Sequence, residues 1–168
     1  MSYQSHHETS ANLRVRCAII TLSDTRTEST DKSGAKIREL LLQNNHEIAH
    51  YQILKDEPAQ LHQLLIELLA RNDIDAILTN GGTGISKRDQ TISVIEKLLD
   101  QPLPGFGELF RMLSWEQIQS GAMLSRAIGG IARGKLIFAM PGSTKAVELA
   151  MTKLILPEFK HLVSELNK

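Results

Sequence analysis

The segment from Thr79 to Thr91, Thr-Asn-Gly-Gly-Thr-Gly-Ile-Ser-Lys-Arg-Asp-Gln-Thr, brings a glycine-rich turn, two cations and a carboxylate together. It follows an apolar run and precedes a helical pattern, and free amide hydrogens at a helix start attract anions. Glycine also lets the backbone approach an anion closely. The segment is therefore predicted to bind a phosphorylated ligand. The alternative is a tight turn without a ligand, because Gly-Gly-Thr-Gly matches neither the Walker A motif nor the dinucleotide fingerprint.

Two carboxylates near this loop are candidates for metal binding. Asp89 either caps the helix that starts at Gln90 or holds a hydrated Mg²⁺, which prefers one or two carboxylates plus phosphate oxygens. Asp56 follows the second predicted strand and is the second carboxylate expected at the same edge, with a loop or cap role as the alternative. The basic residues that are candidates for neutralising phosphate charge are Arg26, Lys87, Arg88 and Lys145.

Short apolar runs alternate with helical patterns along the chain, which is typical of an α/β fold. Strands are predicted at 15–22, 47–54, 75–79 and 135–140. The first has apolar residues on both faces, as a buried parallel strand does. In an open parallel sheet the ligand site lies beyond the carboxyl ends of the strands. Three turns are therefore predicted to form the site, and they cover residues 23–25, 81–89 and 141–144.

Helices are predicted where apolar residues recur at helical spacing. The first starts at Asp31 or Ser33, either of which can accept the free amide hydrogens. The others are expected after Pro58, from residue 90 to the prolines at 102 and 104, at 108–119, after residue 144 and at 158–166, with Pro157 separating the last two. Periodicity leaves residues 125–130 without an assigned structure.

Length and composition fit one soluble domain at 13–168 behind a flexible tail at 1–12 that contains His6 and His7. No stretch approaches the roughly 18 apolar residues of a membrane span. Nineteen basic residues balance nineteen acidic ones, so no global field attracts nucleic acid. Cys17 is the single cysteine and is expected in the core, which favours a cytoplasmic protein.

Other side chains that invite a functional interpretation receive a structural one. Trp115 is expected to pack or to contact another subunit rather than to stack on a ligand. The remaining histidines show no metal-ligand spacing and are assigned no catalytic role; they are His46, His50, His62 and His161.

Several ordered motifs together resemble the MoaB/MogA family of molybdenum cofactor biosynthesis, over nearly the whole chain from about Arg14 onward. They are Gly-Gly-Thr-Gly with Arg88-Asp89, Pro104 to Glu108, Ser125 to Ala127 and Pro141 to Ser143. The segments 106–114 and 138–146 look most like the MoaB branch. After Asp89, however, Gln-Thr-Ile replaces the Thr-Pro-Glu type of sequence common in the MogA branch.

This resemblance implies a three-layer α/β/α sandwich with a mostly parallel sheet, assembled as a trimer or hexamer through contacts that include 110–115. It also implies transfer of AMP from Mg-ATP to the terminal phosphate of molybdopterin. Other molybdenum cofactor biosynthesis proteins are the partners that it implies. Asp89 and Asp56 match the family's catalytic and Mg²⁺-binding acidic positions. The residues that match its pocket segments are Ser23, Asp24, Gly81, Gly82, Thr83, Gly84, Ser125, Arg126, Pro141, Gly142 and Ser143.

Three functions remain as hypotheses at this point. The first is a molybdopterin adenylyltransferase. The second is a MoaB paralogue that binds molybdopterin as a carrier or storage protein without catalysis, as the MoaB-like central segment suggests. The third is a nucleotide-binding domain unrelated to the cofactor, which the ordered set of motifs disfavours.

Overall fold

Six strands form one sheet in the order β2-β1-β3-β6-β5-β4. They are β1 (Arg16–Leu22), β2 (Glu47–Leu54), β3 (Ala76–Asn80), β4 (Gln101–Pro102), β5 (Ile128–Ala132) and β6 (Lys135–Met140). The pairs β1–β2, β1–β3 and β3–β6 are parallel, whereas β5 and β4 add an antiparallel edge. This computed structural model describes residues 12–168, so the first eleven residues of the predicted tail, His6 and His7 included, lie outside it.

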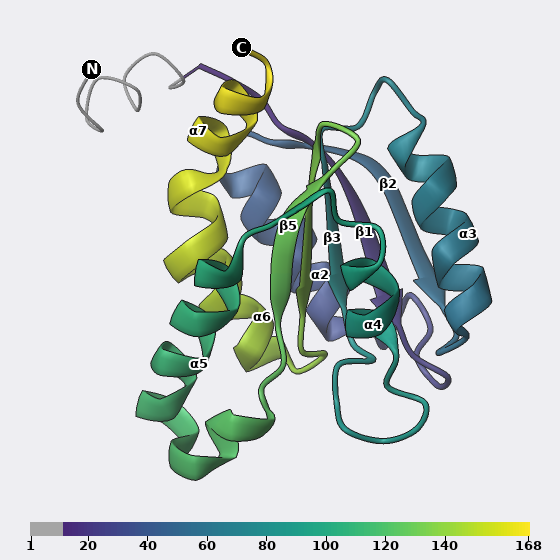
Figure 1. The fold of residues 1–168 in the computed structure, drawn as a ribbon, viewed down its shortest axis with the longest axis vertical. Helices are drawn as coiled ribbons and strands as arrows, with labels where there is room; N and C mark the ends of the chain where they lie inside the picture. The colour runs from purple at the N-terminus through teal and green to yellow at the C-terminus, as the bar shows by residue number, and fades with distance from the viewer. Residues whose placement is uncertain (1–11) are drawn as a thin grey trace.

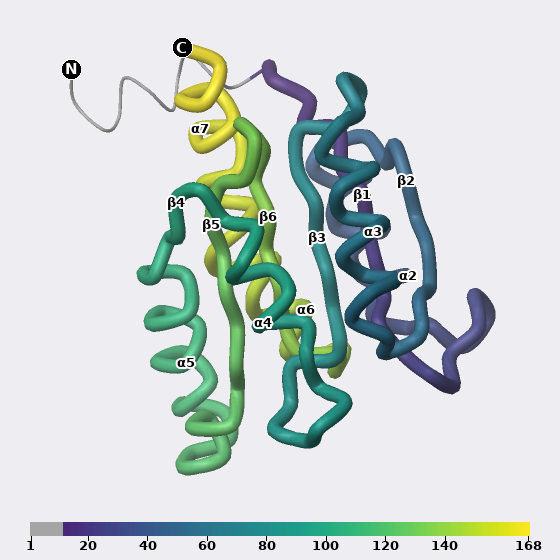
Figure 2. Tube along the Cα trace, turned by 45° about the vertical axis from the view of Figure 1, so that its right-hand side comes forward, coloured from purple at the N-terminus to yellow at the C-terminus, as the bar shows by residue number. Residues whose placement is uncertain are grey.

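Helices cover both faces of the sheet and make the three layers that the family resemblance implies (Figures 1 and 2). On one face lie α2 (Lys32–Gln43), α5 (Pro104–Ile118), α6 (Thr144–Ala150) and α7 (Leu156–Leu166). On the other lie α3 (Pro58–Leu69) and α4 (Thr91–Glu96). A 3₁₀-helix, η1 (Gln119–Leu124), follows α5, and a π-helix, η2 (Met151–Ile155), joins α6 to α7.

The central strands are buried on both faces because their side chains alternate between two separate cores. In β1, Cys17 and Ile19 pack in the core with α2 and α7, whereas Ala18 and Ile20 pack in the core with α3. Successive side chains of a strand point to opposite faces, so a continuous apolar run fills both layers at once. The Cys17 thiol is buried as predicted, and burial raises its pKa well above the ordinary value.

The region between β3 and β6 differs most from the prediction. Helix α4 ends at Glu96, so Leu98 and Leu99 belong to the turn that follows, although both still pack against the core. Pro102 lies in β4, and Pro104 starts α5 instead of ending α4. A proline in the first turn of a helix lacks only an amide hydrogen that would have no partner there. Residues 128–132, with Gly129 and Gly130, form β5.

Pro157 does not separate the last two helices. The Leu156 amide donates to the Met151 carbonyl, five residues earlier, so the chain passes from α6 through the π-helix into α7 without a break. The wider turn accommodates the proline ring, which would clash with a carbonyl of the preceding turn in a regular α-helix.

His46 ties the amino end of β1 to the helical layer. Its Nδ1 accepts the Val15 amide hydrogen at 3.1 Å, and its ring packs edge-on against Phe159. Burial lowers the pKa of His46 to about 4, with the Lys160 charge adding to the effect. Protonation of Nδ1 would remove the acceptor, so the neutral ring is the form that stabilises the fold.

The free energy of unfolding is expected to fall as the pH is lowered from 6.5 towards about 4. In that window the unfolded chain binds a proton at His46 that the folded chain excludes, so stability is lost on acidification. Chemical unfolding at a series of pH values measures the slope. His46→Gln should flatten it, because a glutamine carbonyl still accepts from Val15 but does not titrate. The same substitution at the exposed His62 should leave the slope unchanged, and a full slope in His46→Gln would contradict the assignment.

Candidate functional site

Three turns meet at the carboxyl edge of the sheet because β1, β3 and β6 are neighbours and run in parallel. They follow Leu22, Asn80 and Met140, and the Gly81 amide donates to the Met140 carbonyl at 3.1 Å. Between them lies a cavity of about 470 Å³. Its size is within the range of small-molecule sites. The residues that line it are Leu22, Ser23, Thr25, Arg26, Asp56, Gly81, Gly82, Thr83, Gly84, Asp89, Gly121, Leu124, Ser125, Pro141 and Gly142.

The glycine turn has a backbone that only glycine accommodates easily. Gly81 and Gly82 have φ angles of +95° and +64°. A Cβ at Gly81 would overlap the Leu22 carbonyl, and one at Gly82 would overlap Thr91 Oγ1 and press on Asp56. The glycines thus let the turn pass close to the β1 and β2 edges, and they leave its backbone open to the cavity.

Arg126 stabilises this loop by donating hydrogen bonds to its backbone carbonyls. Its Nε donates to the Thr83 carbonyl at 2.9 Å, and its Nη2 donates to the carbonyls of Gly84 and Asp89. One guanidinium therefore binds both arms of the loop between residues 83 and 89. The sequence predicts Arg126 in the ligand pocket, but its described donors are directed to the loop backbone, and it does not line the cavity.

Asp89 closes the loop on itself. Its Oδ2 accepts the Ser86 amide hydrogen at 3.0 Å, and hydrogen bonds from Ser86 hold its pKa below the usual range. The N-cap of α4 is Gln90, whose side chain makes no capping hydrogen bond, so the interpretation of Asp89 as that helix's cap is wrong. Asp89 lines the cavity and is ionised at neutral pH.

Asp56 is the least compensated charge at the site. Its Oδ1 is buried and has no hydrogen-bond partner among the described residues. Burial raises the pKa of Asp56, and the negative charges of Asp24 and Asp89 raise it further. The Arg88 charge acts in the opposite direction and lowers the pKa of Asp56. A cation at this edge would relieve both of the effects that raise this pKa.

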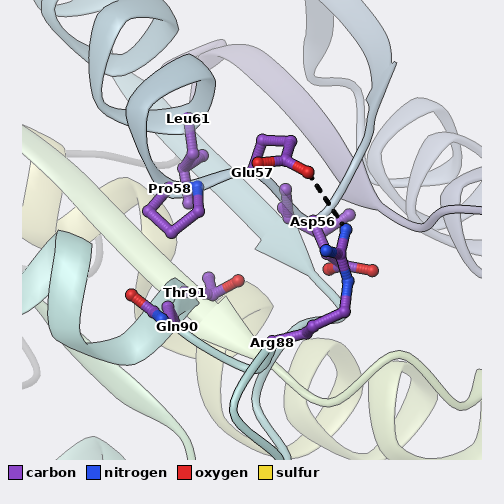
Figure 3. A pocket seen from close by; sticks show the side chains of 8 residues that line it. Asp56, Glu57, Pro58, Leu61, Arg88, Gln90 and Thr91 are labelled. Atoms are coloured by element: carbon purple, nitrogen blue, oxygen red, sulfur yellow. Dashed lines mark hydrogen bonds and ion pairs between the residues drawn. The ribbon is translucent and has the colours of Figure 1, made fainter.

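Arg88 is the counter-ion of this acidic edge (Figure 3). Its guanidinium binds both oxygens of Asp24, at 3.0 and 3.1 Å, and Glu57 Oε1 at 3.2 Å. The bonds from Arg88 hold the pKa of Asp24 below its usual range. Asp24 also accepts the Asp56 amide at 3.1 Å, so it joins the β1 and β2 loops instead of lining the cavity.

Most of the predicted site residues share this cavity. Ser143 instead lines an adjacent groove of about 880 Å³ that shares Ser125 and Pro141 with the first. Lys87 and Lys145 are exposed, and neither lines the main cavity. The sequence predictions did not include Gly121 and Leu124, which come from η1. No motif marks them, and their position depends on how α5 ends.

Among residues 12–168, no three histidine, cysteine or acidic side chains gather in a way that would hold a metal ion by themselves. No helix in the same range is long and apolar enough to cross a membrane.

A parallel sheet with a glycine turn, an acidic edge and a cavity at its carboxyl ends defines a small-ligand-binding α/β protein. The model of the molybdenum cofactor biosynthesis family, described as "Probable molybdopterin binding domain", matches residues 18–161. The chain belongs to this family.

Individual relatives agree with this assignment over their full length. Molybdenum cofactor biosynthesis protein B from Halalkalibacterium halodurans is 54% identical, with 100% of this chain and 99% of the relative covered. A crystal structure of molybdenum cofactor biosynthesis protein B superposes with a TM-score of 0.91 at 54% identity, covering 94% of this chain and 98% of that one. The tungsten cofactor synthesizing protein MoaB from Pyrococcus furiosus gives 0.84 at 34% identity, covering 94% and 100%. The resemblance stated from the motifs is confirmed.

Asp56→Asn is expected to stabilise the ligand-free protein at neutral pH. The substitution keeps the shape of this half-buried side chain and removes its charge, while the buried Oδ1 has no hydrogen-bond partner within residues 12–168. The thermal midpoint should rise by about 2–4 °C, the shift that about 1 kcal/mol produces in a domain of this size. Scanning calorimetry of both proteins measures it. A lower midpoint would show that the carboxylate is compensated in the folded state.

Proposed function

We propose that the protein binds molybdopterin and adenylylates it with Mg-ATP, releasing pyrophosphate before metal insertion. Membership of the family and the similarity to molybdenum cofactor biosynthesis protein B support the pathway. The observation that carries the chemistry is the buried Asp56 oxygen, which has no hydrogen-bond partner in the described part of the chain and shares the cavity with Asp89 and the glycine turn.

The donor set suits Mg²⁺ better than a metal held only by protein. Mg²⁺ binds through one or two carboxylates together with substrate phosphates and water, and Asp56 and Asp89 line the same cavity. Asp56 and Asp89 would hold the ion there, and it would supply positive charge that neutralises the phosphates. The absence of a three-ligand cluster in residues 12–168 agrees with a metal that arrives with its nucleotide.

The proposed reaction joins two phosphates. An oxygen of the terminal molybdopterin phosphate attacks the α-phosphorus of ATP. The bond from that phosphorus to the oxygen bridging the α- and β-phosphates breaks, and pyrophosphate leaves with that oxygen. No side-chain nucleophile is needed, so catalysis depends on positioning and on charge neutralisation. Arg26 is a cation on the cavity wall, and the hydroxyls of Ser23, Thr25 and Ser125 line the same wall as donors.

Asp89→Asn separates the charge of this residue from its role in the loop. The amide oxygen can still accept from Ser86, so the loop keeps its shape while the charge is lost. Pyrophosphate release from molybdopterin and Mg-ATP should fall by about 100-fold or more, the scale for losing one charge-stabilising group. Asp73→Asn, at the opposite edge, is the matched control. Full turnover in Asp89→Asn would show that Asp89 only shapes the loop.

The second candidate function is a carrier or storage protein for molybdopterin, which the MoaB-like segments at 106–114 and 138–146 favour. In this function molybdopterin would occupy the same cavity, and no adenylyl group would be transferred to it. Molybdopterin binding without any pyrophosphate release, with Mg-ATP present, would support this candidate over the transferase.

We also propose that the chain assembles as a trimer or hexamer through α5 and η1. An apolar face there is open to solvent, with Met112 62%, Trp115 54% and Met123 78% exposed. Such clustered apolar exposure marks interaction sites. Trp115 therefore does not pack in the core, and subunit contact is the part of its predicted role that we retain.

Trp115→Glu is expected to shift the protein towards monomers, because a charge would be buried in the contact. Light scattering after size-exclusion chromatography measures the mass. Leu42→Glu, an exposed apolar residue of α2 that is 61% exposed, is the control and should not change it. An unchanged oligomer in Trp115→Glu would contradict the proposed contact.

A further inference from the structure

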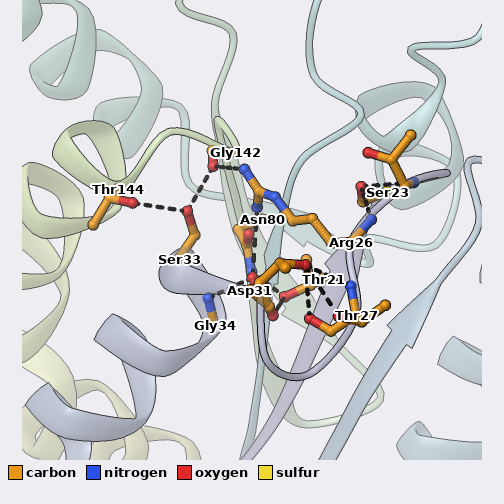
Figure 4. Close-up of polar contacts among 12 residues, drawn as sticks. Thr21, Ser23, Arg26, Thr27, Asp31, Ser33, Gly34, Asn80, Gly142 and Thr144 are labelled. Carbon is orange, nitrogen blue, oxygen red and sulfur yellow. Dashed lines mark hydrogen bonds and ion pairs between the residues drawn. The ribbon is translucent and has the colours of Figure 1, made fainter.

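The Asp31 carboxylate lies behind the cavity and joins four separate parts of the chain (Figure 4). Its side chain is fully buried. Oδ2 accepts from Thr21 Oγ1 of β1 at 2.6 Å and from the Tyr51 hydroxyl of β2 at 2.7 Å. Oδ1 accepts the Gly34 amide at 2.9 Å, which makes Asp31 the N-cap of α2, and it faces Arg26 Nη1 at 3.5 Å.

Arg26 extends this network to the turn after β6. Its Nη2 donates to the Gly142 carbonyl at 2.8 Å, and the Ser33 hydroxyl donates to the same carbonyl at 2.7 Å. Arg26 Nη1 is buried and has no hydrogen bond within the described chain, so its attraction to Asp31 is electrostatic. The guanidinium therefore lies between a fixed anion and the Pro-Gly-Ser turn, and it lines the cavity.

Thr21 extends the network to the turn after β3. Its hydroxyl accepts from Asn80 Nδ2 at 2.9 Å while it donates to Asp31. Asn80 immediately precedes Gly81, the first residue of the glycine turn. Two chains of contacts thus start at the Asp31 carboxylate. One runs through Arg26 to Gly142, and the other runs through Thr21 to Asn80. They end on two adjacent turns that both line the cavity, since a Cβ added at Gly142 would come within 3.1 Å of the Gly81 Cα.

We propose that Asp31 is a positioning residue of the site, which acts through Arg26 and Thr21 to fix the spacing between the Pro-Gly-Ser turn and the glycine turn. This inference rests on the proposed function for the ligand, a phosphorylated pterin. A buried carboxylate that served only as a helix cap would need the Gly34 amide alone. The additional partners from β1, β2 and the 23–31 loop make it the common anchor of the cavity wall.

Arg26→Ala tests the chain of contacts that runs through Arg26 to Gly142, and it leaves the buried charge of Asp31 in place. In the ligand-free protein, amide hydrogen exchange at residues 142–147 should become about tenfold faster, because Gly142 loses one of its two anchors. The dissociation constant for molybdopterin, from calorimetric titration, should rise about tenfold. Guanidinium ion added at millimolar concentration should restore affinity in Arg26→Ala and leave the unchanged protein as it was, since Arg26 lies at the open cavity wall.

Asp31→Asn tests the anchor itself, because it removes the charge that faces Arg26, while its one carbonyl oxygen can still accept either from Thr21 and Tyr51 or from Gly34. The double variant Asp31→Asn with Arg26→Ala should bind molybdopterin no more weakly than whichever single variant binds it more weakly. Both changes break the same chain of contacts, the one through Arg26. Arg71→Gln is the matched control. Like Arg26, Arg71 contacts one carboxylate, that of Asp73, and one backbone carbonyl, that of Ala49, but it lies at the opposite edge of the sheet. Its loss should leave the affinity for molybdopterin unchanged.

Unchanged exchange at 142–147 in Arg26→Ala would overturn the proposal, and so would faster exchange with unchanged molybdopterin affinity. If Asp31→Asn does not fold, Arg26→Ala and its rescue still decide the question. Failure of the unchanged protein to bind molybdopterin would contradict the proposed function instead. The exchange rates would then still show whether Asp31 and Arg26 hold the two turns.

Discussion

The parallel register of β1, β3 and β6 is the constraint on which the site depends. Thr21 pairs with Asn80, and Asn80 pairs with Met140, so the three strands end side by side. This register survives because both faces of each strand are buried, and a shift by one residue would move every side chain into the opposite core. The cavity is therefore held by apolar packing in the middle of the sheet, although glycines and polar residues make up most of its own wall.

Two carboxylates at this edge of the sheet, Asp31 and Asp56, have opposite effects on the stability of the fold. Asp31 is buried with partners on both oxygens, and it makes the surrounding backbone rigid. Asp56 has one buried oxygen without a partner among residues 12–168, and burial together with the charges of Asp24 and Asp89 raises its pKa. Asp31 thus stabilises the fold, whereas Asp56 destabilises it. In return, the unbonded oxygen of Asp56 keeps a capacity for a cation from solution that a fully bonded carboxylate lacks.

The sequence indicates most of this architecture, since buried parallel strands and amphipathic helices carry strong periodic signals. The strands at 47–54 and 135–140 have their predicted bounds. The segment 125–130 gave no such signal, because glycines at 129 and 130 lie in a strand that pairs antiparallel at the edge. Motifs also locate most of the cavity wall. They do not indicate where a long side chain points, so Arg126 and Asp24 were predicted in the pocket although both bind other parts of the protein.

The π-helix between α6 and α7 has a consequence for insertions and deletions in this chain. A π turn holds one residue more than the α-helical turn that it replaces, and one residue corresponds to about 100° of rotation about the helix axis. Deleting one residue within Met151–Ile155 would thus replace the wide turn with an α-helical turn that covers the same rotation, so α7 would keep its phase. Phe159 and Val163 would then stay in the core. The same deletion inside a regular part of α7 would rotate all that follows by about 100°, so the wide turn is the place in this helical segment where a change of length by one residue is absorbed.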